Sequence, residues 1–135
     1  VKGEIDKEGV VEAPLLKDSK NNIVTVDNKM GLPALTRYRR LYTVEGRSMV
    51  EIELITGRSH QARVHMASIG HPILGDIKYG GGDAVQRPML HSYSIGLPVD
   101  DRIPKDTQGK EFFAPIPKDM SSIMERDRKF SSTFD

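Results

Sequence analysis

The strongest constraint on the fold is a change of hydrophobic period near Gly57. Residues 49–55 alternate apolar and acidic side chains, which is the period-two pattern of a strand with one solvent-exposed face. After Gly57 the pattern changes, and it predicts a helix over residues 60–69 with Ser59 as its N-cap. Gly70 is expected to end this helix, because glycine readily adopts the left-handed conformation found just beyond helix C-termini. The sequence therefore predicts a strand–turn–helix unit at the centre of the chain.

The predicted helix is expected to be covered on two sides. Met66 lies on one face, and Val64 lies on roughly the opposite face together with Arg63. An arginine in or near such an interface needs an acidic or phosphate partner. Because residues 55–74 contain no carboxylate side chain, the partner of Arg63 must be Asp76, a distant part of the chain or a ligand.

Composition limits the classes of protein and site that the chain can form. Its 135 residues suit one domain, and a net charge of +1 means that any nucleic-acid surface must be a local basic patch. The absence of cysteine excludes disulfides and thiolate metal sites, and no apolar run has the length of a membrane span. The N-terminus lacks both a methionine and a secretion signal. We therefore expect a fragment or processed piece located in the cytoplasm or an organellar matrix.

The rest of the chain predicts an α+β fold with a mostly antiparallel mixed sheet and few helices. A turn at residues 44–48 would make a hairpin with the strand at 49–55, and Gly80 to Gly82 are expected to form a flexible bend. Residues 129–135 are expected to fray. The other predicted elements are a strand or extended segment over residues 10–16 that ends near Pro14, strands at residues 23–26, 36–43, 92–97 and 110–115, and a helix at residues 120–128.

Three motifs give the sequence a family resemblance. They read T-G-R-S-H-Q-A-R-V-H, G-H-P-I-L-G-D-I-K-Y-G and M-L-H-S, in that order along the chain. They closely resemble the motifs T-G-R-T-H-Q-I-R-V-H, G-H-P-I-x-G-D-x-x-Y-G and L-H-A of the RluA-type RNA pseudouridine synthases. The resemblance covers nearly all of this chain but corresponds only to the C-terminal half of the family's catalytic domain.

The resemblance implies both a reaction and a missing group. Enzymes of this family isomerise uridine to pseudouridine in rRNA or tRNA and need no redox or energy cofactor. Their aspartate nucleophile lies in an R-L-D sequence, which these 135 residues do not contain. We therefore expect that residues 1–135 form the C-terminal part of the domain, without the nucleophile and inactive alone. An incomplete sheet could also promote self-association through its exposed edges.

The resemblance also implies a role for Arg63 and for three residues near the cleft. In the family, the arginine at the position of Arg63 pairs with the aspartate nucleophile, which keeps that acid ionised and oriented. We expect Asp76 to tie a loop rather than to catalyse, and Tyr79 and His91 to be structural residues near the cleft. The alternative for Arg63 is that it only covers the helix with its aliphatic stem.

Several further residues are candidates for contacts with RNA. Arg58 at the strand–helix turn suits phosphate binding, and His60 and Gln61 could hydrogen-bond a nucleotide. For each of these the alternative is a surface or packing role. The remaining candidates are Arg37 and Arg39 on one face of the predicted strand, which could instead protect a solvated edge, and His71.

Two other classes of function remain open from the sequence. One is an RNA-binding module of the same fold that performs no chemistry. The other is a histidine-based metal hydrolase. It is disfavoured because His60 and His65 lie roughly 140° apart around a helix and no H-E-x-x-H motif occurs. We therefore expect no metal site.

Overall fold

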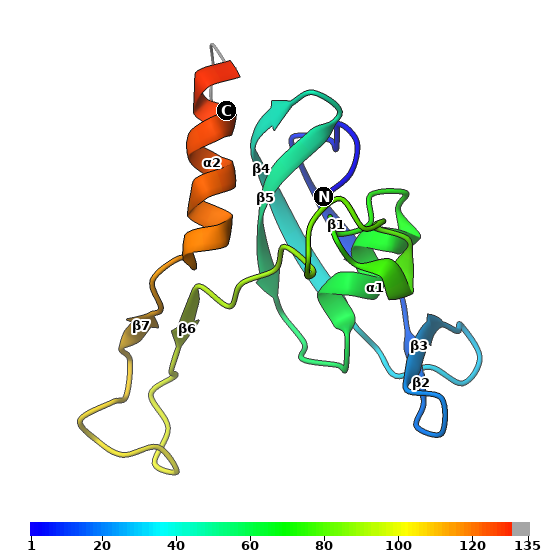
Figure 1. The fold of residues 1–135 in the computed structure, drawn as a ribbon. Coiled ribbons are helices and arrows are strands. Elements are labelled where there is room, and N and C mark those ends of the chain that lie inside the picture. The colour runs from blue at the N-terminus through cyan, green and yellow to red at the C-terminus, as the bar shows by residue number, and fades with distance from the viewer. Residues whose placement is uncertain (131–135) are drawn as a thin grey trace. The chain divides into compact units, whose positions relative to one another are not determined.

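The computed structural model describes residues 1–130, which divide into two units. Unit 1 comprises residues 1–89 and the segment from Asp127 onward, and unit 2 comprises residues 90–126. Figure 1 shows the course of the chain through both. Strands and helices occur together, as expected for an α+β protein. All strand pairs in the described residues are antiparallel, and they form three separate sheets rather than one mixed sheet.

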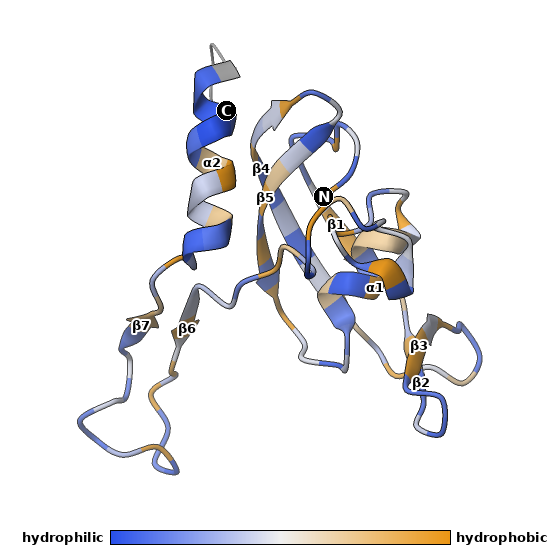
Figure 2. Ribbon diagram, in the orientation of Figure 1, coloured by the Kyte–Doolittle hydropathy of each residue, from blue (hydrophilic) through white to orange (hydrophobic). Residues whose placement is uncertain are grey.

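The main sheet of unit 1 has three strands in the order β1-β4-β5. They are β1 (Glu8–Glu12), β4 (Leu35–Val44) and β5 (Arg47–Leu54). The predicted hairpin is confirmed, because β4 and β5 are joined by Glu45 and Gly46, both with positive φ. A two-residue turn in which both residues have positive φ has a backbone twist that matches the right-handed twist of the two strands it joins. Figure 2 shows polar and apolar residues interspersed along β4 and β5. In β4 the exposed Arg37 and Arg39 alternate with the less exposed Thr36 and Tyr38, as expected for a sheet with one solvent-exposed face.

A two-stranded hairpin forms the second sheet, with β2 (Leu15–Asp18) paired to β3 (Ile23–Val26). The predicted strand at residues 23–26 is confirmed. The predicted strand or extended segment over residues 10–16 breaks near Pro14 as expected, because the chain passes there from β1 to β2. Proline has no N–H to donate to a strand ladder, which explains the break.

The central helix is α1 (Gln61–Ser68), and its C-terminus is the one expected. Gly70 has a φ of 85°, its N–H donates to the carbonyl of Ala67, and the N–H of His71 donates to the carbonyl of Met66. These two bonds define a Schellman motif, which requires a left-handed residue at the position of Gly70. The prediction of Ser59 as N-cap was wrong, because the N-cap is His60 and no side chain caps the helix.

Helix α1 packs between two clusters of buried apolar residues, so the expectation of a helix covered on both sides is confirmed. Met66 belongs to the cluster on the side of the main sheet, and Val64 belongs to the cluster with the β2–β3 hairpin. The first cluster also contains Ile5, Val11 and Ile73, and the second also contains Leu15, Val24 and Ala34. The helix is thereby held in a fixed position relative to both sheets.

The loop after α1 leads to a short 3₁₀ helix, η1 (Ile77–Tyr79), and to the glycine triplet. The prediction of a flexible bend was wrong for Gly81, because its backbone is packed tightly. A Cβ atom at this position would lie 1.7 Å from the carbonyl oxygen of Ile73. The N–H of Gly81 also donates to the carbonyl of Asp76 at 2.6 Å, so the bend closes a compact loop.

Unit 2 contains the hairpin of β6 (Ser94–Gly96) and β7 (Glu111–Phe113) and the first part of α2 (Lys118–Phe130). The strands predicted at residues 92–97 and 110–115 and the helix predicted at 120–128 are confirmed, with shifted ends. The predicted fraying of 129–135 is wrong for residues 129 and 130, which are helical, and residues 131–135 lie outside the described part. No helix within residues 1–130 is both long and apolar enough to cross a lipid bilayer.

A buried carboxylate, that of Asp127, joins the last turn of α2 to the β4–β5 hairpin. Asp127 is 2% exposed, accepts a hydrogen bond from the Tyr42 hydroxyl at 2.8 Å and forms an ion pair with Arg47. Burial, together with the hydrogen bond to Asp127, raises the pKa of Tyr42. The Tyr42 hydroxyl therefore keeps its proton at neutral pH and donates it to Asp127.

Candidate functional site

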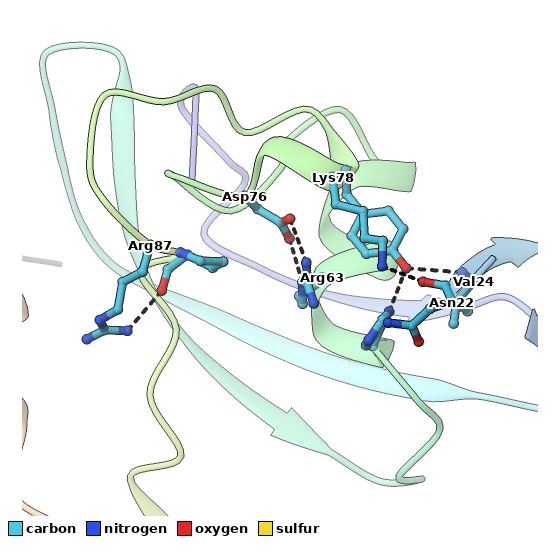
Figure 3. Close-up of polar contacts among 9 residues, drawn as sticks. Asn22, Val24, Arg63, Asp76, Lys78 and Arg87 are labelled. Carbon is cyan, nitrogen blue, oxygen red and sulfur yellow. Dashed lines mark hydrogen bonds and ion pairs between the residues drawn. The ribbon is translucent and has the colours of Figure 1, made fainter. Parts of the chain in front are cut away.

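Arg63 and Asp76 form a two-point ion pair between α1 and the loop that precedes η1. The Nε atom of Arg63 lies 2.8 Å from Oδ2 of Asp76, and Nη2 lies 2.9 Å from Oδ1 (Figure 3). Asp76 is completely buried, whereas the Arg63 side chain is 22% exposed. The hydrogen bonds to Asp76 raise the pKa of Arg63 above its usual value. Of the three partners that the sequence allowed for Arg63, the structure shows Asp76.

Tyr79 supports Arg63 from a second direction. The guanidinium carbon of Arg63 lies 5.0 Å from the centre of the Tyr79 ring, which is the geometry of a cation–π contact. The hydroxyl of Tyr79 accepts a hydrogen bond from the N–H of Val24 at 3.0 Å and lies 2.6 Å from Nδ1 of His60. Tyr79 thereby connects the arginine to the β2–β3 hairpin and to the start of α1.

His60 occupies an unusual backbone position in this group. Its φ is 54°, in the left-handed region that few residues other than glycine adopt. Burial lowers the pKa of His60, and the positive charges of Arg63, Lys78 and Lys17 lower it further. A neutral imidazole can accept the Tyr79 hydroxyl hydrogen at Nδ1, which leaves the N–H on Nε2. His60 then acts as a neutral hydrogen-bond donor beside the arginine.

The low pKa of His60 gives a first prediction. In a histidine-resolved NMR titration of the natural gene product, we expect His60 to titrate with a midpoint below its ordinary value of 6.5. The folded protein therefore loses stability as pH falls below 6.5, because the unfolded chain binds the proton more readily. Replacing Lys78 with glutamine should raise the midpoint, because it removes one of the neighbouring positive charges. A midpoint at or above 6.5 would contradict the arrangement.

The side chain of Gln61 is buried within the fold and is not accessible to a ligand. It is 2% exposed. Its oxygen accepts hydrogen bonds from the Thr56 hydroxyl and the Arg58 N–H, and its Nε2 donates to the Leu35 carbonyl and the Thr36 hydroxyl. These bonds use both sides of the amide, so the geometry does not support the predicted contact of Gln61 with a nucleotide. Gln61 instead ties the strand–helix turn to β4.

The candidate arginines outside α1 are exposed, but they lie close to other groups of the chain. Arg58 donates from Nε to the carbonyl of Pro33 at 2.8 Å, which directs its side chain along the surface of the turn. Arg39 forms a 3.4 Å ion pair with Glu51, and Arg37 stands opposite Glu53 in the strand register. Both candidate arginines of β4 therefore lie opposite acids on β5, which weakens the basic patch expected from the sequence.

The other two candidate histidines hydrogen-bond backbone carbonyls. The Nδ1 atom of His71 lies 2.9 Å from the carbonyl oxygen of Lys2, and the side chain lines a surface hollow with Ile5 and Tyr38. His91 belongs to unit 2, where its Nε2 atom lies 3.1 Å from the carbonyl oxygen of Ala114. The structure thus does not bring His71 into the Arg63 group.

Two contributors to the site were missed from the sequence. Lys78 and Lys17 both act on the charge state of His60, and Lys78 also donates to the carbonyl of Asn22 (Figure 3). Lys17 lies in a charged segment without a motif, and Lys78 falls at a position that the family motif leaves open, so neither lysine gave a signal. Within residues 1–130, no group of three or more potential metal ligands lies close together.

Comparison with known proteins relates this chain to one family. Residues 1–68 match the family described as RNA pseudouridylate synthase. The chain is 34% identical over 125 residues to an uncharacterised RNA pseudouridine synthase of Chloroflexus aurantiacus, covering 90% of this chain and 38% of the relative. It is 35% identical over 140 residues to ribosomal large subunit pseudouridine synthase D of Nitrosomonas europaea, covering 95% and 39%.

A solved structure shows the same fold. Human RNA pseudouridylate synthase domain containing 1 superposes with a TM-score of 0.64 at 25% identity, over 99% of this chain and 64% of that one. The chain spans about two fifths of the length of the curated relatives it matches.

Proposed function

Because the chain belongs to the RNA pseudouridylate synthase family, we propose that it is part of a catalytic domain that isomerises uridine to pseudouridine in RNA. The reaction breaks the bond between N1 of uracil and C1′ of the ribose and forms a bond between C5 and C1′. C5 loses a proton to solvent, and N1 gains one. The observation that carries the proposal is the fixed, partly exposed guanidinium of Arg63 on a helix with the family's motif.

We assign to Arg63 the binding of the nucleophilic carboxylate. Within residues 1–130, Nη1 of Arg63 makes no hydrogen bond, while Nε and Nη2 are held by Asp76. A second carboxylate could therefore bind at the outer edge of the guanidinium. An arginine in this position favours the ionised form of the acid and fixes its orientation. The carboxylate in our proposal belongs to an R-L-D sequence outside these 135 residues.

We further propose that the substrate is structured RNA and that its phosphates are bound by exposed cations near the turn before α1. Arg58 is the first candidate, since its guanidinium is exposed at the strand–helix turn. His60, Arg37, Arg39 and His71 remain candidates for weaker contacts. The names of several relatives refer to the large ribosomal subunit, so we propose rRNA before tRNA, and a protein located with its RNA in the cytoplasm or an organellar matrix.

Mapping of pseudouridine in cells tests the proposed function. Pseudouridine would be mapped across rRNA and tRNA from cells that lack the gene and from cells complemented with the wild type or with Arg63→Gln. We expect at least one site to disappear on deletion and to return with the wild type only. An unchanged set of sites after deletion would contradict the proposal.

We also propose that isolated residues 1–135 self-associate through the exposed edge of the main sheet. The strand β1 lies at this edge, and its residue Val10 is 60% exposed. Unpaired edge strands readily pair with another chain. A monomeric mass in light scattering of the isolated residues 1–135 would contradict this part of the proposal.

A further inference from the structure

We propose that Asp76 is a positioning residue for the reaction, which aims the guanidinium of Arg63 at the nucleophilic carboxylate. This inference rests on the proposed function. It gives Asp76 a role beyond tying a loop, because one arginine would bridge two carboxylates. One carboxylate is the buried Asp76, and the other belongs to the nucleophile.

The geometry of the guanidinium carries the first step. An arginine side chain has five N–H donors in one plane. Asp76 uses the inner edge, with bonds of 2.8 Å to Nε and 2.9 Å to Nη2. The outer edge, formed by Nη1 and the second N–H of Nη2, keeps three donors. Two parallel N–H groups of this edge match the two oxygens of a carboxylate. A second acid can therefore bind without displacing Asp76.

The second step is that Asp76 itself is held rigidly. Its own N–H donates to the carbonyl of Ile73 at 3.0 Å, and its carbonyl accepts from the N–H of Gly81 at 2.6 Å. The loop is closed again by the N–H of Gly75, which donates to the carbonyl of Gly81 at 3.2 Å. Neither Gly75 nor Gly81 has room for a Cβ atom. A fully buried carboxylate on such a loop fixes its partner more precisely than a solvent-exposed one.

The third step is that rotation out of the plane is also restricted. The Tyr79 ring lies against the guanidinium at 5.0 Å, and its hydroxyl is held by Val24 and His60. Asp76 fixes the direction of Arg63 within the plane, and Tyr79 supports its face. Arg63 is thus oriented before any nucleophile or substrate binds, which is the condition for efficient electrostatic catalysis.

The test is the substitution Asp76→Asn in the natural gene product, assayed by tritium release from RNA labelled at C5 of uridine. Asparagine has the same size but no charge, and it offers one acceptor oxygen in place of two. We expect kcat to fall by about 10- to 100-fold, the range found when a supporting residue or a small misplacement affects catalysis. KM should change less than about twofold, because Asp76 is buried and does not contact substrate.

Asp127→Asn is the matched control for stability. Asp127 is also buried and is also paired with an arginine, Arg47, but it lies outside the Arg63 group. We expect Asp127→Asn to lower the melting temperature and to leave kcat within about twofold of wild type. Equal losses of kcat in the Asp76 and Asp127 variants would show a merely structural effect and would overturn the inference.

A double-mutant cycle tests whether Asp76 acts through Arg63. We expect Asp76→Asn to lower kcat by less than about twofold in a protein that already carries Arg63→Lys, because the bidentate geometry is then lost. Independent, multiplicative effects would overturn the inference, as would an Asp76→Asn protein with wild-type kcat. An inactive wild-type protein would instead contradict the proposed function itself.

Discussion

Replacing Arg63 with glutamine in the natural gene product is expected to lower kcat for pseudouridine formation by about 1,000-fold. The expected loss follows from removal of a preorganised positive charge beside the reacting groups, which typically costs factors of this size. Steady-state tritium release from C5-labelled RNA measures it. Arg102→Gln is the control, because Arg102 is an exposed arginine paired with Asp100 and is not among the proposed RNA contacts, and we expect its kcat to remain within about twofold of wild type.

A loss of folding must be separated from a loss of catalysis in this experiment. Without Arg63, the carboxylate of Asp76 is buried and unpaired, which costs about 3–5 kcal/mol. The double substitution Arg63→Gln with Asp76→Asn removes that charge and should recover most of the melting temperature. It should not recover activity. A variant that regained stability and also more than a tenth of wild-type kcat would contradict the role of Arg63.

Replacing Gly81 with alanine is expected to lower the free energy of unfolding by about 3 kcal/mol, the upper end of the cost of overpacking. The added Cβ atom would lie 1.7 Å from the carbonyl oxygen of Ile73 and 2.8 Å from the backbone nitrogen of Asp76. Both neighbours are backbone atoms, so the loop must move to accommodate the methyl group. Denaturant unfolding of the natural gene product measures the change.

Gly57→Ala is the matched control for this prediction. Gly57 has no atom within 4 Å of an added Cβ and no positive φ, so we expect unfolding free energy to change by less than about 0.5 kcal/mol. Because Gly81 donates to the carbonyl of Asp76, Gly81→Ala should also lower kcat in the folded protein. Equal stability of the Gly81 and Gly57 variants would contradict the close packing of the loop.

The parts of the fold that depend on local chemistry were predictable from the sequence. Gly70 ended α1 as expected, because a left-handed C-terminal residue is a local requirement. The hairpin of β4 and β5 was also predictable from local features. These are the alternation of apolar and acidic residues over 49–55 and the glycine in the preceding turn. The N-cap was not predictable, because Gln61 holds the start of α1 through tertiary bonds to Leu35 and Thr36.

The candidate site was also predictable only where it depends on local sequence. The charge of Arg63 on an apolar helix required a partner, and counting the acids nearby left Asp76 among three alternatives. The bidentate geometry, the Tyr79 contact and the burial of Gln61 depend on residues distant in sequence, so periodicity and spacing could not reveal them. The positions of Arg37 and Arg39 opposite acids of β5 depend on strand register, which the sequence alone did not define.

Tritium release by two forms of the protein tests whether Arg63 needs a nucleophile from outside residues 1–135. The first is the natural gene product that contains these residues, and the second is residues 1–135 alone, both incubated with C5-labelled RNA. We expect release by the natural gene product and none by residues 1–135, because Arg63 is present in both and the R-L-D carboxylate is absent from residues 1–135. Release by residues 1–135 alone would contradict this expectation and would make Asp76 the first candidate for the nucleophile.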